Sequence, residues 1–234
     1  MSFGAYLTVW LVVGFLAGSI PFGWIVTRAK GIDIRQVGSG NIGATNVIRA
    51  LGWGWGGLVF LLDLLKGLTP LIGLKLCLPH LPAGMVPAGA APWLVMGVGV
   101  AAILGHTFTP WLRFKGGKGI ATGAGVIIAV MGWWALAPLG AFLLIAATSR
   151  MISLGSLFGA MLVTATICTV PTIRAYWPLG VITLIIVLWT HRANIERILN
   201  GTENRIGQKQ PAAEPESVAA DDQPSGDGDQ AKDE

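Results

Sequence analysis

One segment of this chain combines the side chains and the backbone freedom that bind an anion. Between residues 31 and 49 it reads G-I-D-I-R-Q-V-G-S-G-N-I-G-A-T-N-V-I-R. Glycines admit positive φ angles, and successive amides can then form a concave anion site, to which hydroxyl and amide side chains add donors. Arginine adds a planar fork that matches phosphate. The candidate ligands are Arg35, Gly38, Ser39, Gly40, Asn41, Gly43, Thr45, Asn46 and Arg49.

The glycine spacing in this segment also fits the dinucleotide-binding pattern G-x-G-x-x-G. That pattern requires a preceding strand and a βαβ unit, whereas an apolar run long enough for a membrane helix precedes it here. The dinucleotide interpretation is therefore rejected, and the local anion chemistry remains.

A second basic segment, F-K-G-G-K-G-I-A-T, covers residues 114–122. It is not a P-loop, because Gly119 stands where a serine or threonine is required and no glycine stands five residues before Gly117. Gly116, Gly117, Lys118 and Gly119 precede an apolar helix, and a helix N-terminus beside a lysine is still an anion site. The alternative is an ordinary basic loop.

Two further segments place polar residues beside apolar runs. Ser153 and Ser156 follow Arg150, and Ser153 is either a helix N-cap or a substrate ligand. His191 and Asn194 are three residues apart, so they share one face of a helix. The alternative for the histidine is an interfacial polar residue without a further role.

The elements that must position these segments are membrane helices. Hydrophobic residues make up 53% of the chain and charged residues 12%, about half the roughly 25% that is usual in soluble proteins. Several apolar runs approach the ~20 residues that span a bilayer. We therefore expect an all-α, polytopic integral membrane bundle. The seven expected spans are residues 5–27, 53–76, 92–107, 120–131, 133–149, 155–171 and 175–190.

The fourth and fifth expected spans could instead form one long tilted helix. Gly132, Pro138 and the adjacent Trp133 and Trp134 favour a hairpin between them. Five or six spans are the alternative to seven.

The distribution of basic residues predicts the orientation. When loops are assigned alternately, thirteen of the sixteen lysines and arginines fall on one side. By the positive-inside rule that side is cytoplasmic, so the N-terminus is expected outside and the C-terminus inside. Residues 1–27 carry no basic n-region, so the first span is expected to be a retained anchor.

The chain is expected to divide at about residue 203. Residues 204–234 hold eight of the twelve acidic residues and almost nothing apolar, which predicts a disordered, acidic cytoplasmic tail. The transmembrane domain, residues 1–203, holds thirteen basic and four acidic residues, a formal charge of +9. Topology and anionic lipids explain part of this charge. They do not explain its alternation with glycine, serine, threonine and asparagine.

Two charged residues are expected inside the second span. Asp63 and Lys66 are three residues apart, in a region where charges are costly and usually paired. An internal ion pair that supports the site is favoured over direct substrate contact. The chain has no cluster of histidines or cysteines, so no metal site is expected.

Jointly, these motifs resemble those of the acyl-phosphate-dependent glycerol-3-phosphate acyltransferase family, bacterial membrane enzymes that make lysophosphatidic acid. The resemblance runs from about Gly18 to Gly207, and no motif position departs from it. It covers G-S-I-P, I-D-I-R-x-x-G-S-G-N-x-G-x-T-N-x-x-R, D-x-x-K-G, G-H-x-F, F-K-G-G-K-G-x-A-T, S-L-G-S and H-R-x-N-I-x-R-x-x-x-G-T-E.

The resemblance implies acyl transfer from a fatty acyl phosphate to the sn-1 hydroxyl of glycerol 3-phosphate, in the bacterial inner membrane, with the active site facing the cytoplasm. Membrane lipid is the expected surrounding; no cofactor and no nucleic acid partner are expected. Carried over by motif, the catalytic residues are Ser39, Arg49, Lys118, His191 and Asn194. The implied substrate-binding residues are Arg35, Gly38, Gly40, Asn41, Gly43, Thr45, Asn46, Gly116, Gly117, Gly119, Ser153 and Ser156.

The implied donor is a mixed anhydride that is already activated, so the protein need not supply a nucleophile. No Ser-His-Asp or Cys-His triad is evident, and the H-x-x-x-x-D signature of other glycerolipid acyltransferases is absent, because Trp111 stands five residues after His106. The proton acceptor stays open between His191, whose intrinsic pKa is about 6.5, and a substrate phosphate.

A transporter for a phosphorylated solute is the rival interpretation, because it would also need a basic mouth. Transporters place their polar groups near the bilayer midplane within repeated halves. In this chain the distinctive polar residues gather at one face, and no convincing repeat is visible. A non-catalytic lipid-binding scaffold is a third interpretation.

Overall fold

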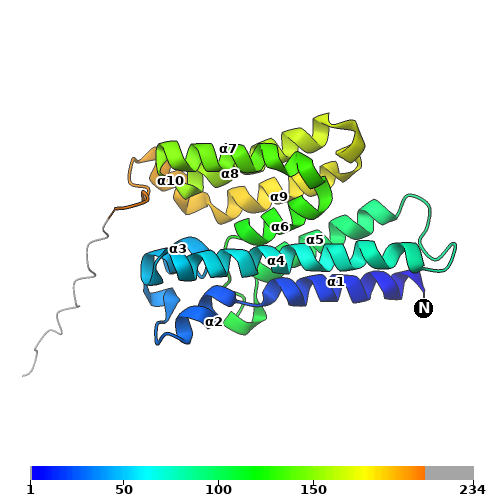
Figure 1. Cartoon of the computed structure of the whole chain (residues 1–234), viewed down its shortest axis with the longest axis horizontal. Coiled ribbons are helices and arrows are strands. Elements are labelled where there is room, and N and C mark those ends of the chain that lie inside the picture. Colours follow the sequence, from blue (N-terminus) through cyan, green and yellow to red (C-terminus); the bar gives the residue numbers. More distant parts are fainter. Residues whose placement is uncertain (1, 209–234) are drawn as a thin grey trace, which may run out of the picture.

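Helices form the whole of the regular structure in the described part of the chain. The structure is a computed structural model that describes residues 2–208, and it contains helices and turns but no strand within that range. The α-helices are α1 (Phe3–Ser19), α2 (Phe22–Arg28), α3 (Ala44–Leu51), α4 (Trp53–Cys77), α5 (Ala91–Thr107), α6 (Ile120–Met131), α7 (Leu136–Ser149), α8 (Ile152–Thr169), α9 (Trp177–Thr190) and α10 (Arg192–Leu199). The all-α expectation is confirmed, and Figure 1 shows the long helices aligned along one axis.

Short 3-10 helices complete the connections. They are η1 (Ile34–Gln36), η2 (Leu78–His80), η3 (Pro110–Leu112), η4 (Gly132–Ala135) and η5 (Pro171–Tyr176).

Proline and glycine set the helix boundaries that matter for the site. Helix α1 ends at Ser19 because the residue before Pro21 is driven out of the helical region, and Ile20 is indeed extended (φ −60°, ψ 117°). Helix α6 begins after Gly119, whose φ is +79°. Such an angle is a left-handed conformation that side chains disfavour. The backbone conformations at Ile20 and Gly119 therefore set where α1 ends and where α6 begins.

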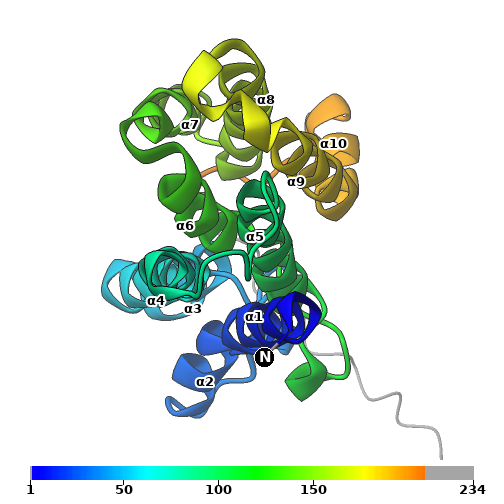
Figure 2. The ribbon, with the colours of Figure 1, turned by 90° about the vertical axis from the view of Figure 1, so that its right-hand side faces the viewer.

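Small residues bring the long helices into close contact. A Cβ added at Gly18 of α1 would lie 2.0 Å from the carbonyl oxygen of Ala102 on α5, and one at Gly67 of α4 would lie 2.1 Å from the carbonyl oxygen of Thr122 on α6. In lipid, helices associate through such close packing because no hydrophobic force drives them together. Figure 2 shows two groups of helices, α1 to α6 on one side and α7 to α10 on the other, with α5 beside α9.

Six segments of residues 2–208 are long and apolar enough to cross a membrane, where seven were expected. They are Phe3–Arg28, Trp53–His80, Ala91–Leu112, Ile120–Ser149, Ile152–Thr169 and Pro171–Thr190. The expected and observed numbers of segments differ because of the fourth segment, which is 30 residues long. It joins α6 and α7, each too short to count alone.

The fourth segment reverses direction at Gly132, whose φ is +56°. Its two ends lie close together. Lys118, just before α6, bonds to Asn194, which bonds to Glu203. Ser153, just after α7, bonds to the same Glu203. Helices α6 and α7 therefore run in opposite directions. Helix α6 packs against α4, and α7 packs against α8.

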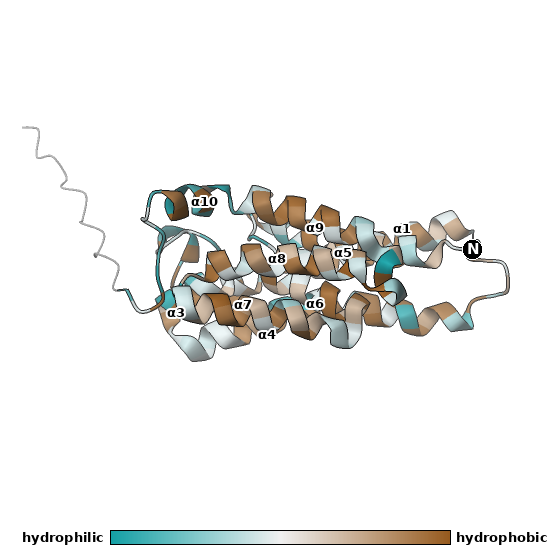
Figure 3. Cartoon of the chain, turned by 90° about the horizontal axis from the view of Figure 1, so that it is seen from above, coloured by the Kyte–Doolittle hydropathy of each residue, from teal (hydrophilic) through white to brown (hydrophobic). Residues whose placement is uncertain are grey.

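The polar loops gather at one end of the bundle. Figure 3 shows hydrophilic residues concentrated around α3 and α10, whereas the helices between the two ends are mostly hydrophobic. Of the predicted acidic tail, residues 204–208 lie at this end, and residues 209–234 lie outside the described residues.

Candidate active site

Asn46 holds the first glycine loop, residues 38–43, from inside. Its side-chain oxygen accepts the Ser39 backbone N–H at 3.1 Å, and its Nδ2 donates to the carbonyl oxygens of Val37 at 2.8 Å and Ile34 at 3.2 Å. The side chain is 2% exposed. The side chain of Asn46, expected among the substrate ligands, thus makes its hydrogen bonds to the loop backbone.

The first glycine loop presents the groups that Asn46 leaves free. Gly38 and Gly40 adopt φ angles of +58° and +67°. Asn41 accepts the Gly43 N–H at 2.8 Å just before α3, and Thr45 belongs to the first turn of α3, where N–H groups have no intrahelical partner. Ser39 is exposed, and its hydroxyl makes no hydrogen bond to the described residues. The Ser39 hydroxyl and the Thr45 N–H remain available to an anion, whereas the Gly40 N–H donates to the Val37 carbonyl oxygen at 3.0 Å and the Gly43 N–H is occupied by Asn41.

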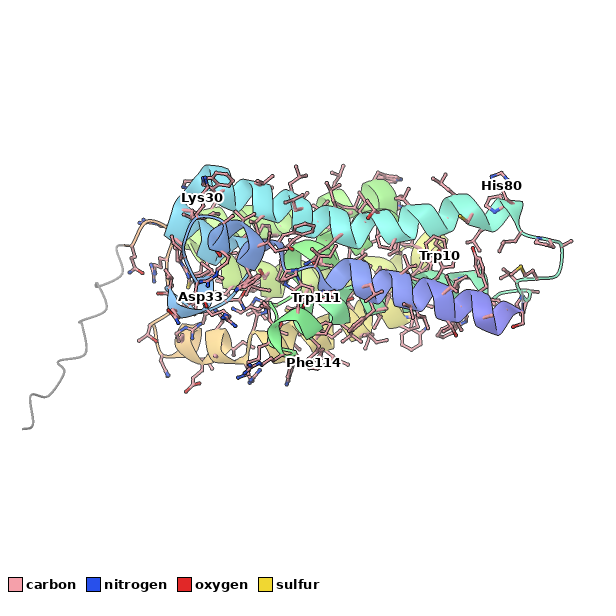
Figure 4. The ribbon with its side chains drawn as sticks, turned by 90° about the horizontal axis from the view of Figure 1, so that it is seen from below. Trp10, Lys30, Asp33, His80, Trp111 and Phe114 are labelled. Atoms are coloured by element: carbon pink, nitrogen blue, oxygen red, sulfur yellow. The ribbon has the colours of Figure 1, made fainter. Side chains whose placement is uncertain are left out.

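Arg35 is already paired. Its guanidinium donates to Asp33 at 2.9 and 2.6 Å, and this hydrogen bond lowers the pKa of Asp33 to about 2. Figure 4 shows Asp33 at the α3 end of the bundle, far from His80. Arg35 therefore contributes less free charge to the site than expected.

The second glycine loop, residues 114–119, is shaped by the end of α5. The Gly116 N–H donates to the carbonyl oxygen of Thr107 at 3.0 Å, and the Gly117 N–H donates to that of His106 at 3.1 Å. These two amides, expected to bind an anion, are thus occupied by backbone. The loop carries Lys118 forward, and Gly119 begins α6.

Glu203 joins the third and fourth polar segments. Its Oε1 accepts hydrogen bonds from Ser153 at 2.8 Å and from Asn194 at 2.7 Å, and its Oε2 lies 2.9 Å from Arg197 Nε. The oxygen of Asn194 in turn accepts a hydrogen bond from the Lys118 ammonium. One carboxylate thereby connects α8, α10 and the second glycine loop.

Burial and hydrogen bonds shift the pKa values of the charged groups in this cluster. Burial raises the pKa of Glu203, but the hydrogen bonds from Asn194, Ser153 and Arg197 together bring it below its ordinary value. Burial lowers the pKa of Lys118 from 10.5 to about 8, and the charge of Glu203 only partly offsets this. Arg49, on α3, lies close enough to interact with Glu203, Arg197 and Lys118. It makes no ion pair with a described residue.

His191 is buried at the junction of α9 and α10. It is 2% exposed, and its Nδ1 lies 2.9 Å from the carbonyl oxygen of Val187. A carbonyl only accepts, so Nδ1 carries the proton and Nε2 is left as an acceptor. Burial, followed by the charge of Lys118, lowers the pKa of His191 to about 4. The imidazole is neutral at physiological pH.

A polar cavity of about 220 Å³ separates the two glycine loops. Asn41 lines it from the first loop, and Lys118 lines it from the second. Thr190, the last residue of α9, and Arg192, the first of α10, line the third side. A compact anion entering here would meet groups from three separate segments.

An apolar cavity of about 110 Å³ begins at the same lysine. It runs between α6 on one side and α7, α8 and α9 on the other. Small residues line it, among them Gly123 of α6 and Gly159 of α8. Gly119 and Ser156 lie on its wall, and the Ser156 hydroxyl donates to its own helix at the Ile152 carbonyl oxygen. The cavity suits an alkyl chain.

The structure thus brings most of the predicted residues together around Lys118. Asn41, Gly116 and Gly117 share its polar cavity. Asn194 bonds to it directly, and Ser153 joins through Glu203. Within residues 2–208 no group of three or more His, Cys, Asp or Glu side chains could hold a metal ion.

Three residues of this cluster were absent from the predicted site: Arg192, Arg197 and Glu203. Glu203 had a detectable signal, because it is one of only four acidic residues in the first 203 and it stands among basic ones. A carboxylate that stands among several basic residues is expected to pair with one of them.

Comparison with known proteins identifies the family of the chain. The family model described as glycerol-3-phosphate acyltransferase matches residues 8–201. The glycerol-3-phosphate acyltransferase of Rippkaea orientalis is 41% identical over 200 residues, which cover 85% of this chain and 92% of that protein. One from Thermus thermophilus is 38% identical over 207 residues, with 86% of this chain and 96% of that protein covered.

Two crystal structures of PlsY (YgiH), described as an integral membrane glycerol 3-phosphate acyltransferase, are similar to this chain. The glycerol 3-phosphate form has a TM-score of 0.77 and 36% identity, and the lysophosphatidic acid form has 0.75 and 35%. Each match covers 86% of this chain and 96% of the other. The chain is therefore a multi-pass integral membrane protein that belongs to the glycerol-3-phosphate acyltransferase family.

Proposed function

We propose that this protein transfers an acyl group from a fatty acyl phosphate to the sn-1 hydroxyl of glycerol 3-phosphate, giving 1-acyl-glycerol 3-phosphate and inorganic phosphate. The observation that carries the proposal is the position of Lys118, which lines both the polar and the apolar cavity. A donor with a phosphate head and an alkyl tail fits that junction. PlsY, 35–36% identical, has been crystallised in glycerol 3-phosphate and lysophosphatidic acid forms.

Charge balance supports two phosphorylated substrates. A phosphate monoester carries close to two negative charges at neutral pH, so the site must hold about four. Lys118 and Arg49 supply cations, and Arg192 lines the polar cavity. The Ser39 hydroxyl and the first N–H groups of α3 supply neutral donors. We assign the catalytic charge stabilisation to Arg49 and Lys118, and phosphate binding to the first glycine loop.

The reaction needs orientation more than a protein nucleophile. The glycerol hydroxyl oxygen attacks the acyl carbonyl carbon, the bond from that carbon to the phosphate oxygen breaks, and phosphate leaves with the electron pair. Holding the reactants in line and stabilising the developing charge can lower the barrier by several kcal/mol. Asn194, fixed between Lys118 and Glu203, keeps the ammonium in place.

We assign His191 a positioning role, with a substrate phosphate as the proton acceptor. A histidine whose pKa is about 4 binds a proton weakly at neutral pH. Its free Nε2 can still accept a hydrogen bond from a glycerol hydroxyl. A phosphate dianion, with a second pKa near 6, is the stronger base in the same site.

The role of His191 is tested by the variant His191→Gln. Glutamine accepts a hydrogen bond but cannot become a cation, so turnover should persist and the loss should appear mainly in the KM for glycerol 3-phosphate. Near-zero turnover at saturating glycerol 3-phosphate, with binding intact, would assign the base to His191.

For the membrane topology we propose seven crossings, with the N-terminus outside and the C-terminus and the site in the cytoplasm. The antiparallel course of α6 and α7 supports two crossings there, and the lysines and arginines in the loops next to α3 and α10 support the orientation. Single cysteines at position 84 and position 200, in a chain without Cys77 and Cys168, should label with a membrane-impermeant maleimide from opposite sides. Labelling of both from one side would refute the topology.

The activity itself is tested with purified protein in detergent. Release of inorganic phosphate from an acyl phosphate should require glycerol 3-phosphate and should match the lysophosphatidic acid formed. Acyl-CoA should not replace the donor, because the polar cavity accommodates a compact phosphate and the described helices leave no domain for a coenzyme. Comparable turnover with acyl-CoA would overturn the donor assignment.

A further inference from the structure

The middle of α4 contains a buried polar cluster that the proposed mechanism does not use. Asp63 Oδ1 lies 2.7 Å from Lys66 Nζ and 3.8 Å from Nδ1 of His106 on α5. The three residues are 2%, 5% and 3% exposed. The expected internal ion pair is present, and the histidine joins it.

The cluster touches the chain on both sides of Lys118. On one side, the His106 ring covers Gly117, where an added Cβ would lie 2.1 Å from Nε2, and the His106 carbonyl oxygen accepts the Gly117 N–H. On the other side, Gly67, adjacent to Lys66, packs against the backbone of Thr122 in the first turn of α6. The segment from Gly117 to Thr122 is therefore held from α4 and α5.

The same cluster reaches the first glycine loop through the break between α1 and α2. Lys66 Nζ donates to the carbonyl oxygen of Ile20 at 2.6 Å. Just beyond the break, Gly23 of α2 packs so closely on the first glycine loop that a Cβ would lie 1.8 Å from the carbonyl oxygen of Ile42. Both glycine loops thus pack on helices that Lys66 and Asp63 connect.

Stability alone does not account for such a cluster. Removing two charges from water costs about as much as their attraction returns, and replacing a buried ion pair by apolar residues is often neutral or stabilising. A directional pair does, however, fix the relative positions of the elements that carry it. The contacts on both sides of Lys118 indicate which positions are fixed.

We propose that Asp63, Lys66 and His106 are positioning residues that set the location of Lys118 relative to the first glycine loop. They act through Gly117, Thr122 and Ile20 and touch no substrate. The proposal rests on the proposed function only in that acyl transfer is its readout.

The test removes both charges together. Single variants Asp63→Asn and Lys66→Met each leave one partner unpaired and should lower the melting temperature in detergent. The double variant leaves no buried charge, so its melting temperature should recover while kcat stays at least tenfold below wild type. A double variant with wild-type stability and wild-type kcat would show that the pair is only structural.

A neutral replacement decides the question if the double variant fails to fold. His106→Gln keeps a polar side chain but loses the ring that covers Gly117, so kcat should fall at least tenfold with little change in melting temperature. Wild-type kcat in a folded His106→Gln protein would overturn the proposal. Lys75→Met is the matched control for Lys66→Met. Lys75 is also on α4, but it donates to the carbonyl oxygen of Ala129, far from the loops. Its removal should leave kcat unchanged.

A double-mutant cycle then tests whether His106 acts through Lys118. In a Lys118→Arg background the cation is already displaced. The fold-loss of kcat caused by His106→Gln should therefore be smaller than in the wild type. Equal losses in both backgrounds would mean that His106 acts elsewhere. Inactive wild-type protein would refute the proposed function instead, because every variant here is measured as a ratio to wild type.

Discussion

The two glycine loops look alike as sequence, yet they are built on opposite plans. The first is held from within by two side chains, Asn46 and Asn41, and leaves a hydroxyl and the start of α3 free. The second is held from outside by α5, which occupies the amides of Gly116 and Gly117, and it places Lys118 where the two cavities meet. Glycine-rich basic segments can thus supply either donors or a positioned charge.

The sharpest way to test this difference is to remove the cation of the second loop. Lys118→Met keeps most of the volume and eliminates the charge at the junction of the two cavities. We expect kcat/KM to fall about 100-fold or more, measured as phosphate release. The melting temperature should stay near that of wild type, and a misfolded variant would make Lys118 a packing residue.

A methyl group added at Gly117 should displace the second glycine loop from α5. Gly117→Ala would place a Cβ 2.1 Å from His106 Nε2, and the buried ring has little room to move. We expect at least a tenfold loss of activity together with a lower melting temperature. Gly140→Ala, with no atom within 4 Å of the added Cβ, is the control and should change neither quantity.

The pH dependence should separate the titrating cation of the second loop from the arginines. Because the pKa of Lys118 is lowered to about 8, the charge is present below that pH and lost above it. The kcat/KM of the free enzyme should therefore decline above pH 8, by about tenfold per unit. Lys118→Arg should move this alkaline limb to higher pH. An unchanged limb would assign it to another group.

Arg35 and Arg49 provide a comparison within the first segment. Arg35→Met removes a guanidinium that Asp33 already pairs at the exposed surface, so the activity should fall less than about threefold. Arg49→Met removes an arginine without an ion pair to any described side chain and should cost much more. Similar losses for the two variants, measured as KM and kcat, would contradict the geometry.

The smallest effect is expected from truncation after Gly207. This change removes the predicted acidic tail beyond the described helices and retains Glu203. The purified truncated protein should keep the kinetics of the full chain. A large loss of turnover would show that the tail acts on the site.

The sequence predicted the helices well because a bilayer demands long apolar runs, and it located the four polar segments that meet at Lys118. The number of spans was harder to predict, because α6 and α7 are short and continuous in hydropathy. The hydrogen-bond partners of the Asn46 side chain and of the Gly116 and Gly117 amides were not predictable. Residue type reveals a donor, whereas only packing reveals whether backbone or ligand receives it.

The depth of the second loop bears on the lifetime of the donor. Gly117 rests on His106, and His106 faces Asp63, which stands ten residues after Trp53 at the start of α4, or about 15 Å along that helix. In Figure 4, Trp111 and Phe114 of the neighbouring segment also lie well inside the end marked by Asp33. Water is the competing acceptor for any activated acyl group, and we expect it to reach a recessed floor less readily than an exposed one. We expect this depth to favour ester synthesis over hydrolysis.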